Sequence, residues 1–264
     1  MNELKPKGRL FNAYRCMHEQ GFIPIFVENE RDPKMLIEAC IQAGIRCIEY
    51  TLRCPDADKM IPWIRQNYPD IYLLVGSTLD NDDIIRKAKV KHPQLLTLSE
   101  LAQMGADGFV SMVGWKLENI EKYSSTHIVC PCAETVREAF LQLGAGSHFI
   151  KVLGPSLEVA KNCRKGPTFG TCPIMITGGM NLEKIDAAVA AGAVIIGTGF
   201  DLLLNNQPSN ISCRQVTDIL KQYINAVKES RAKYFPEMAE AIGRDAEIWL
   251  NSLPHIHPFG KRTP

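Results

Sequence analysis

The sequence lacks long apolar segments. Among its 264 residues, no stretch approaches the ~20 apolar residues that a helix needs to cross a bilayer. The first seven residues also lack the apolar core of a secretory signal peptide. We therefore expect a protein with no membrane partner.

The chain also lacks an excess of charge of either sign. Lys and Arg total 30 and Asp and Glu total 29, so the formal net charge is +1. Runs of charge are short and mixed in sign, which is typical of solvated surface. Because a nucleic-acid surface needs a basic excess, we expect no nucleic-acid partner.

Cysteine pairs that could form disulfides or hold zinc are missing. The nine cysteines are scattered, and their odd number argues against a disulfide framework. Cys130 and Cys132 have no second pair at the spacing of a zinc site. His255 and His257 share a proline-flanked tail, which is more typical of a mobile end than of a metal site. These patterns predict buried free thiols in the reducing cytoplasm, with no metal and no cofactor.

Short apolar runs alternate with helical patterns from residue 21 to about residue 201. This alternation indicates βα units around a parallel sheet. The expected strands are residues 22–27, 46–52, 72–76, 108–111, 127–130, 148–153, 173–177 and 194–197. Helical patterns between them include residues 33–43, 57–67, 82–90, 134–143, 156–163 and 182–190.

Eight such units predict an α/β fold, the (β/α)8 or TIM barrel. A doubly wound open sheet would need a Gly-x-Gly-x-x-Gly turn after the first strand, where this chain has Val27-Glu28-Asn29-Glu30. An amphipathic helix within residues 1–20 is expected to plug the barrel floor. We assign residues 1–209 to the barrel with this helix. Residues 210–264 form a C-terminal helical extension, which is part of the same domain or an oligomer contact.

Lys151 lies within an apolar strand that ends just before Gly154. Burial of a lone ammonium is costly unless it is paired or loses its proton, and the neutral amine is a nucleophile. This placement indicates Schiff-base chemistry on a carbonyl substrate. The alternative is a lysine at the strand edge whose ammonium reaches water.

Glu49 follows an apolar run at the end of the second strand and shares a strand face with Thr51 and Arg53. Strands two and six stand opposite each other in an eight-strand ring, so Glu49 and Lys151 can reach one substrate. A Schiff-base lysine needs a partner that moves protons, and a carboxylate fills that role. The alternative is an outward glutamate in a surface ion pair.

Glycine-rich turns follow the last two strands, as Thr177-Gly178-Gly179 and Gly197-Thr198-Gly199. Barrels bind phosphate at this place through backbone N–H groups and a helix N-terminus. The two turns together predict an anion site, for a phosphate or a carboxylate. Thr78, after the third strand, adds a hydroxyl for a carboxylate or a carbonyl.

From about residue 21 to residue 204 the chain resembles the 2-keto-3-deoxy-6-phosphogluconate (KDPG) aldolases, which include the 4-hydroxy-2-oxoglutarate (KHG) aldolases. Glu49-Tyr50-Thr51-Leu52-Arg53 is similar to the family's Glu-Val-Thr-Leu-Arg, and Phe109-Val110-Ser111 to its Phe-Val-Ser-Pro-Gly. Pro131-Cys132-Ala133-Glu134-Thr135 is similar to Pro-Gly-Val-x-Thr-Pro. Ile150-Lys151 stands where the family has Leu-Lys-Phe-Phe-Pro, and Thr177-Gly178-Gly179 is similar to Pro-Thr-Gly-Gly-Ile.

The resemblance implies a class I aldolase, a carbon–carbon lyase that uses no metal. It would cleave a 2-keto-3-deoxy acid, with or without a 6-phosphate, to pyruvate and an aldehyde. Lys151 would attack the C2 ketone and Glu49 would move protons. The pyruvate-end carboxylate would meet Arg53 and Thr78. The far end of the substrate would meet Thr177, Gly178, Gly179, Gly197 and Thr198. Subunits of this family assemble as trimers, so we expect a homo-oligomer, a trimer or a multiple of it.

The chain departs from the family near the far end of the substrate. Val152-Leu153-Gly154 replaces Phe-Phe-Pro, and Met112 stands where a proline is usual. Gly197-Thr198-Gly199-Phe200 replaces Gly-Gly-Ser-Trp, so the phosphate-binding serine is absent and Thr198 would supply a hydroxyl instead. Two other functions stay open at this point. One is a phosphate-binding barrel isomerase or epimerase with Glu49 as its base, and the other is a non-catalytic anion-binding barrel.

Overall fold

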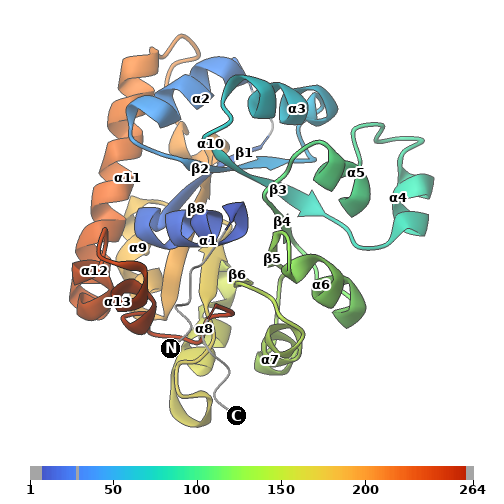
Figure 1. Ribbon diagram of the computed structural model, residues 1–264. Coiled ribbons are helices and arrows are strands. Elements are labelled where there is room, and N and C mark those ends of the chain that lie inside the picture. Colours follow the sequence, from blue (N-terminus) through green and yellow to red (C-terminus); the bar gives the residue numbers. More distant parts are fainter. Residues whose placement is uncertain (1–7, 28–29, 260–264) are drawn as a thin grey trace.

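Eight parallel strands form the barrel that the sequence predicts (Figure 1). The computed structural model describes residues 8–27 and 30–259. The strands are β1 (Phe22–Phe26), β2 (Cys47–Thr51), β3 (Tyr72–Thr78), β4 (Gly108–Ser111), β5 (Ile128–Cys130), β6 (Ile150–Leu153), β7 (Ile174–Thr177) and β8 (Ala193–Gly199). Each overlaps its expected segment, so the strand prediction and the (β/α)8 fold are confirmed.

Lys151 lies at the seam where the barrel closes. The paired strands follow the order β5-β4-β3-β2-β1-β8-β7-β6, which leaves β5 and β6 at the two ends. The backbone N–H of Lys151 donates to the carbonyl of Pro131 (2.8 Å), and that of Ala133 donates to the carbonyl of Lys151 (3.0 Å). These two bonds join the ends, so the backbone of Lys151 is held from both sides.

Helices cover the outside of the barrel. They are α2 (Pro33–Gln42), α3 (Ala57–Asn67), α4 (Asp82–Ala88), α5 (Leu98–Gln103), α6 (Leu117–Ser124), α7 (Val136–Gly144), α8 (Leu157–Arg164), α9 (Leu182–Ala190) and α10 (Phe200–Leu203). Asp32 and Asn181 act as N-caps of α2 and α9, since their side chains accept from the backbone N–H groups of Lys34 and Lys184. Caps of this kind stabilise a helix by about 1 kcal/mol each.

Helix α1 (Arg9–Gln20) lies across the barrel floor, as predicted (Figure 1). Its apolar face buries Phe11, Tyr14 and Met17. The ring of Tyr14 stacks on that of Phe149, with centroids 5.1 Å apart, and lies 6.0 Å from that of His148. His148 therefore lies at the barrel floor.

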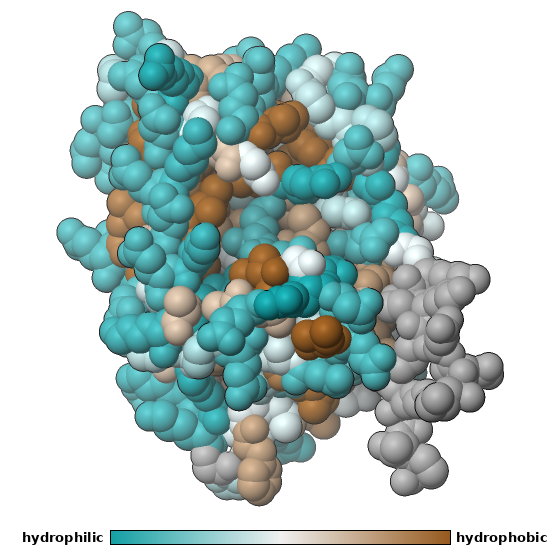
Figure 2. Space-filling view, turned by 60° about the vertical axis from the view of Figure 1, so that its left-hand side comes forward, coloured by the Kyte–Doolittle hydropathy of each residue, from teal (hydrophilic) through white to brown (hydrophobic). Residues whose placement is uncertain are grey.

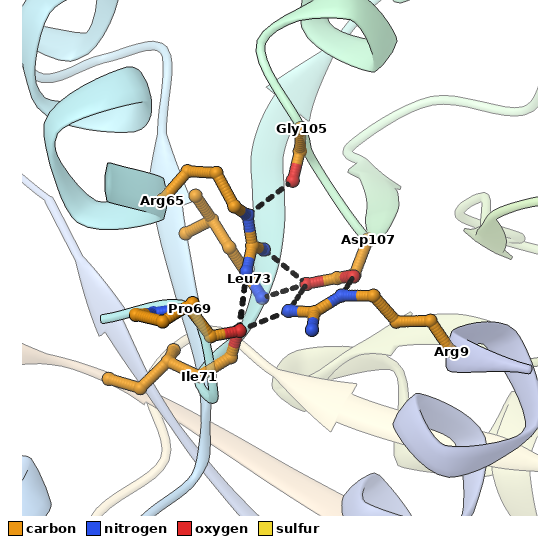
Figure 3. A network of polar contacts seen from close by, with 7 residues as sticks. All are labelled: Arg9, Arg65, Pro69, Ile71, Leu73, Gly105 and Asp107. Carbon is orange, nitrogen blue, oxygen red and sulfur yellow. Dashed lines mark hydrogen bonds and ion pairs between the residues drawn. The ribbon is translucent and has the colours of Figure 1, made fainter. Parts of the chain in front are cut away.

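A buried carboxylate fastens α1 to the barrel. Figure 3 shows Asp107, at the start of β4, between the guanidinium groups of Arg9 on α1 and Arg65 on α3. Asp107 also accepts from the backbone N–H of Leu73 (2.8 Å). Because one carboxylate serves two helices and a strand, this network sets how the floor helix sits on the sheet.

The described part of the C-terminal extension, up to residue 259, contains three helices. They are α11 (Cys213–Tyr234), α12 (Pro236–Glu240) and α13 (Ala246–Asn251). Helix α11 runs along α2 and α9, as Figure 1 shows, and buries Val216, Leu220 and Val227 in the same hydrophobic cluster as the barrel residues. The extension thus packs on the barrel of its own chain.

The prediction of a mobile tail at His255 is wrong. His255 is buried, and its Nε2 lies 2.9 Å from Nε2 of His18 on α1. Burial lowers the pKa of His255 to about 4, and the pKa of His18 is also lowered. Both rings are therefore neutral at pH 7, which allows one to donate to the other. The tail has no periodic pattern, so its docking onto α1 left no signal in the sequence.

Candidate active site

Glu49 points into the barrel from β2. Its carboxylate lies against Gly76 of the neighbouring β3, where an added Cβ would stand 2.0 Å from Oε1. The side chain is only 1% exposed, and Oε2 has no hydrogen-bond partner among the described residues. A buried carboxylate with an unbonded oxygen is free to accept a proton from a substrate. The alternative of an outward glutamate in a surface ion pair does not hold.

Lys151 also points inward, from the opposite side of the ring. In the register of β6 and β7 it pairs with Met175, whose methyl group lies beside Gly197 of β8 inside the barrel. The lysine is 3% exposed, so it is not a strand-edge residue whose ammonium reaches water.

The two groups share one electrostatic environment. Burial raises the pKa of the Glu49 carboxyl above its ordinary value, while the positive charges of Lys151 and then Arg53 oppose that rise. A nearby opposite charge favours the ionised form of a carboxyl and so lowers its pKa. The interior therefore brings together an amine and a carboxylate whose charges are coupled.

Arg53 and Thr78 differ in what they can offer a substrate. Arg53 is exposed and lines a cavity of about 600 Å³ at the ends of β1, β2 and β8. Thr78 is buried, and its hydroxyl donates to the carbonyl of Val110 (2.9 Å). The guanidinium of Arg53 is thus available for a carboxylate, whereas the hydroxyl proton of Thr78 is already used.

The turn after β7 needs its glycines. Gly178 and Gly179 have φ angles of 79° and 67°, in the left-handed region that favours glycine. An added Cβ at Gly154, after β6, would stand 2.3 Å from the carbonyl oxygen of Gly178. The loops after β6 and β7 approach each other closely here, which explains why this chain has Gly154 where the family that it resembles has a proline. Thr177, the last residue of β7, is buried beside them.

The end of β8 differs from what the sequence suggested. Gly197 faces the interior, because an added Cβ would stand 2.8 Å from Cγ2 of Thr177. Strand alternation then places Thr198 on the outer face, and its buried hydroxyl has no partner among the described residues. The Thr198 hydroxyl therefore does not replace the missing serine at the barrel mouth.

An acidic residue that the sequence analysis missed lies at this end of β8. The carboxylate of Asp201 lies over Gly199, where an added Cβ would stand 2.1 Å from Oδ1. Asp201 lines the same cavity as Arg53. Asp201 directly follows the Gly197–Phe200 segment, where an anion was expected to bind. This position could have identified it from the sequence as a candidate site residue.

Two further interior residues also escaped the sequence analysis as site residues. Cys130 lies with its Sγ 3.9 Å from Sδ of Met175, and both Lys151 and Glu49 act on its charge. Burial raises the pKa of this thiol, so it is protonated at pH 7. Gly76 is the other, and its role is to leave room for Glu49.

The described residues contain no group of three or more His, Cys, Asp or Glu that could hold a metal ion. Cys130 and Cys132 are buried free thiols. Within the same ranges, 8–27 and 30–259, no helix has the length and apolar character to cross a membrane.

A buried amine and a buried carboxylate lie inside a (β/α)8 barrel, close to the carboxyl-terminal ends of its strands, where barrel enzymes carry their reactive groups. The family model described as KDPG and KHG aldolase matches residues 15–219. The chain therefore belongs to the KDPG and KHG aldolase family.

Individual relatives agree with this assignment. The 2-dehydro-3-deoxy-6-phosphogalactonate aldolase of Escherichia coli (strain K12) is 26% identical over 196 residues, which span 73% of this chain and 88% of that enzyme. A structure described as native KDPGal has a TM-score of 0.62 and 21% identity, and the match covers 79% of this chain and 95% of that one. The KDPG aldolase of Legionella pneumophila, captured with pyruvate as a covalent carbinolamine, has a TM-score of 0.59 and 18% identity, over 81% and 97% of the two chains. At these identities the two structures show a shared fold.

Family membership makes this protein a carbon–carbon lyase, a class I aldolase that cleaves 2-keto-3-deoxy acids through a Schiff base. It decides against the isomerase and the non-catalytic barrel, the two alternatives that the sequence motifs had left open.

Proposed function

We propose that Lys151 forms the Schiff base and that Glu49 transfers the protons. The observation that carries the proposal is the burial of both groups in one interior, with their charges coupled across the barrel. A raised pKa suits Glu49 to this work, because it must accept and release protons at ordinary pH.

In this mechanism the neutral amine of Lys151 adds to the C2 ketone and gives a carbinolamine. Glu49, as the acid, protonates the departing hydroxyl, and loss of water leaves a protonated imine. Glu49, now a carboxylate, takes the proton of the C4 hydroxyl. The C3–C4 bond breaks, its electrons pass into the imine to form an enamine, and the aldehyde leaves. Protonation at C3 and hydrolysis then release pyruvate and restore the amine.

We assign Arg53 as the main ligand of the pyruvate-end carboxylate. Its guanidinium lines the cavity at the strand ends and acts on the pKa of Glu49, so it stands near the reacting groups. A guanidinium binds a carboxylate through two parallel hydrogen bonds. Thr78 contributes less than its family position implies, because its hydroxyl proton is bonded to Val110.

We further propose that the far end of the substrate carries hydroxyl groups instead of a 6-phosphate. The turn at Gly178 and Gly179, with Thr177 and Gly197 beside it, supplies backbone groups there. The Asp201 carboxylate over Gly199 repels a phosphate at the end of β8 and accepts hydrogen bonds from hydroxyls.

The test is a cleavage assay that compares matched phosphorylated and unphosphorylated 2-keto-3-deoxy acids. We expect a higher kcat/KM for the unphosphorylated acid. In Asp201→Ser the preference should move toward the phosphorylated acid by about tenfold, equivalent to ~1.4 kcal/mol. Asp218→Ser, on the exposed face of α11, is the control and should leave the preference unchanged. A wild-type preference for the phosphorylated acid that Asp201→Ser does not alter contradicts the proposal.

Lys151→Met and Lys161→Met test the lysine assignment. Lys161 is a surface residue paired with Glu158, so its loss should leave cleavage intact. Loss of Lys151 should abolish cleavage of every acid in the panel. Cleavage by Lys151→Met at a rate near that of the wild type refutes the assignment.

We also propose that the enzyme works as a trimer in the cytoplasm. Nine cysteines, all free, suit a reducing compartment. Met112, Val113 and Leu117, which follow β4, expose apolar surface that an interface would cover. Light scattering should give the mass of three chains for the wild type and of one chain for Val113→Asp. A wild-type monomer contradicts the trimer.

A further inference from the structure

A second cavity lies at the floor of the barrel, at the opposite end from the carboxyl-terminal ends of the strands. Its volume is about 710 Å³, within the range of small-molecule sites. Residues of α1, α11 and α12 line it, together with Arg46 and Tyr72 at the starts of β2 and β3. Figure 2 views the molecule from the side of α11 and shows apolar surface in recesses between hydrophilic rims. The aldolase reaction makes no use of this cavity.

A buried arginine without a counter-charge lines the cavity. Arg231, in the last turn of α11, is 3% exposed and forms no ion pair with any described residue. Its Nε has no hydrogen-bond partner among those residues, and its Nη2 meets only Sδ of Met238 at 3.4 Å, a weak acceptor. Burial lowers the pKa of Arg231 to about 10, as expected for a charge without compensation.

The carboxylate that acts on the pKa of Arg231 is already engaged. Glu19 opposes the lowering of the pKa of Arg231 but is not paired with it. Oε1 of Glu19 accepts from Nε of Arg15 (2.9 Å) and from the backbone N–H of Gly243 (3.0 Å). Glu19 is therefore held by other donors on the cavity wall.

The fold nevertheless makes room for this guanidinium. Gly21, the left-handed C-cap of α1, would place an added Cβ 2.0 Å from Nη1 of Arg231. The carboxyl-terminal end of α1 carries a partial negative charge that attracts a cation. This partial charge is smaller than a full counter-charge, so the helix dipole alone does not compensate for the burial of an unpaired ion. An anion in the cavity would.

The rest of the wall fits an organic anion. Its apolar part includes Ile224, Ala239 and Ile242. Its other charged residues are Arg15, Arg46, Lys228, Glu19 and Glu240, so the cations outnumber the carboxylates. We propose that the floor cavity binds a small organic anion, a carboxylate or a phosphate ester, with its charged group on Arg231 and its apolar body against Ile224 and Ala239.

The test is calorimetric titration of the full chain with decanoate, decyl phosphate and decanol. We expect the two anions to bind at least tenfold more tightly than the neutral alcohol. The tighter of the two anions identifies the head group. Lack of saturable binding up to millimolar concentrations overturns the proposal, and so does equal binding of decanoate and decanol.

Arg231→Met and Lys228→Met form the matched pair. Both lie on α11 and line the cavity, but Lys228 is exposed. Arg231→Met should weaken anion binding at least tenfold without changing decanol binding, whereas Lys228→Met should weaken it less than threefold. Anion binding by Arg231→Met at wild-type strength overturns the proposal.

Two more variants distinguish anion binding in the floor cavity from binding at the aldolase site and from a loss of folding. Ala239→Trp fills the cavity while Arg231 itself is kept, and it should abolish anion binding. Lys151→Met should bind decanoate as the wild type does, while Arg231→Met should keep wild-type aldol cleavage. If Lys151→Met removes decanoate binding and Ala239→Trp leaves it intact, the anion binds in the barrel mouth. That result overturns the proposal.

Discussion

Gly76→Ala tests how tightly the barrel positions its carboxylate. An added Cβ at Gly76 would stand 2.0 Å from Oε1 of Glu49, whereas ordinary contact begins near 3.4 Å. The carboxylate must therefore move by about 1.4 Å. Since a misplacement of ~1 Å can cost ~100-fold in rate, we expect kcat/KM for aldol cleavage to fall about 100-fold. Global stability should fall by about 1–3 kcal/mol, because the added methyl also meets Cγ2 of the buried Thr51 at 2.9 Å and that side chain must shift.

The control is Gly144→Ala, where an added Cβ meets nothing within 4 Å. It should change kcat/KM less than twofold. The shorter carboxylate of Glu49→Asp gives a second check. Adding Gly76→Ala to Glu49→Asp should cost less than Gly76→Ala costs the wild type, because the clash with the glutamate carboxylate is then gone and only that with Cγ2 of Thr51 (2.9 Å) remains. A Gly76→Ala enzyme with kcat/KM within threefold of the wild type would refute this account of how Glu49 is positioned.

Three other predictions follow from buried ionisable side chains. The raised pKa of Glu49 should place the acid limb of the kcat/KM profile above pH ~4.3, the ordinary glutamate pKa, and a limb at or below that value contradicts its burial. Asp107→Asn leaves Arg9 and Arg65 without their carboxylate and should lower the free energy of unfolding by about 3 kcal/mol in a denaturant titration. The control is Asp83→Asn, at an exposed ion pair, which should lower the free energy of unfolding by less than about 0.5 kcal/mol. The pKa of His255 is about 4 in the folded protein and ~6.5 in the unfolded chain. As the pH falls from 6.5 to 4, the unfolded chain therefore binds a proton before the folded protein does. The free energy of unfolding should fall over this range by on the order of 2–3 kcal/mol. His255→Gln should flatten that slope, and an unchanged slope contradicts the assignment.

Most of the barrel could be predicted from the sequence because its signals are local. Apolar runs of strand length, Asp32 and Asn181 as helix caps, and glycines after helices each report on a few consecutive residues. Alternation along one strand also placed Glu49 on the same face as Thr51 and Arg53, but the choice between an inward and an outward face required the coordinates. The same reasoning applied to β8 would have placed Thr198 outward, once Gly197 was known to face the interior.

The remaining features depend on contacts between segments that are distant in sequence. Gly76 matters because of Glu49 on another strand, and Gly154 because of the carbonyl of Gly178. His255 meets His18 across 237 residues of chain. The isolation of Arg231 is visible only when every neighbouring group has been placed. None of these leaves a periodic or compositional pattern, so they require coordinates.

The most direct test of the central claim is to trap the imine. The enzyme is incubated with pyruvate and reduced with borohydride, and the modified peptide is identified by mass spectrometry. Our account predicts one reduced pyruvyl group per chain, on Lys151, and none in Lys151→Met. An absent adduct, or one on a different lysine, would contradict the Schiff-base role of Lys151.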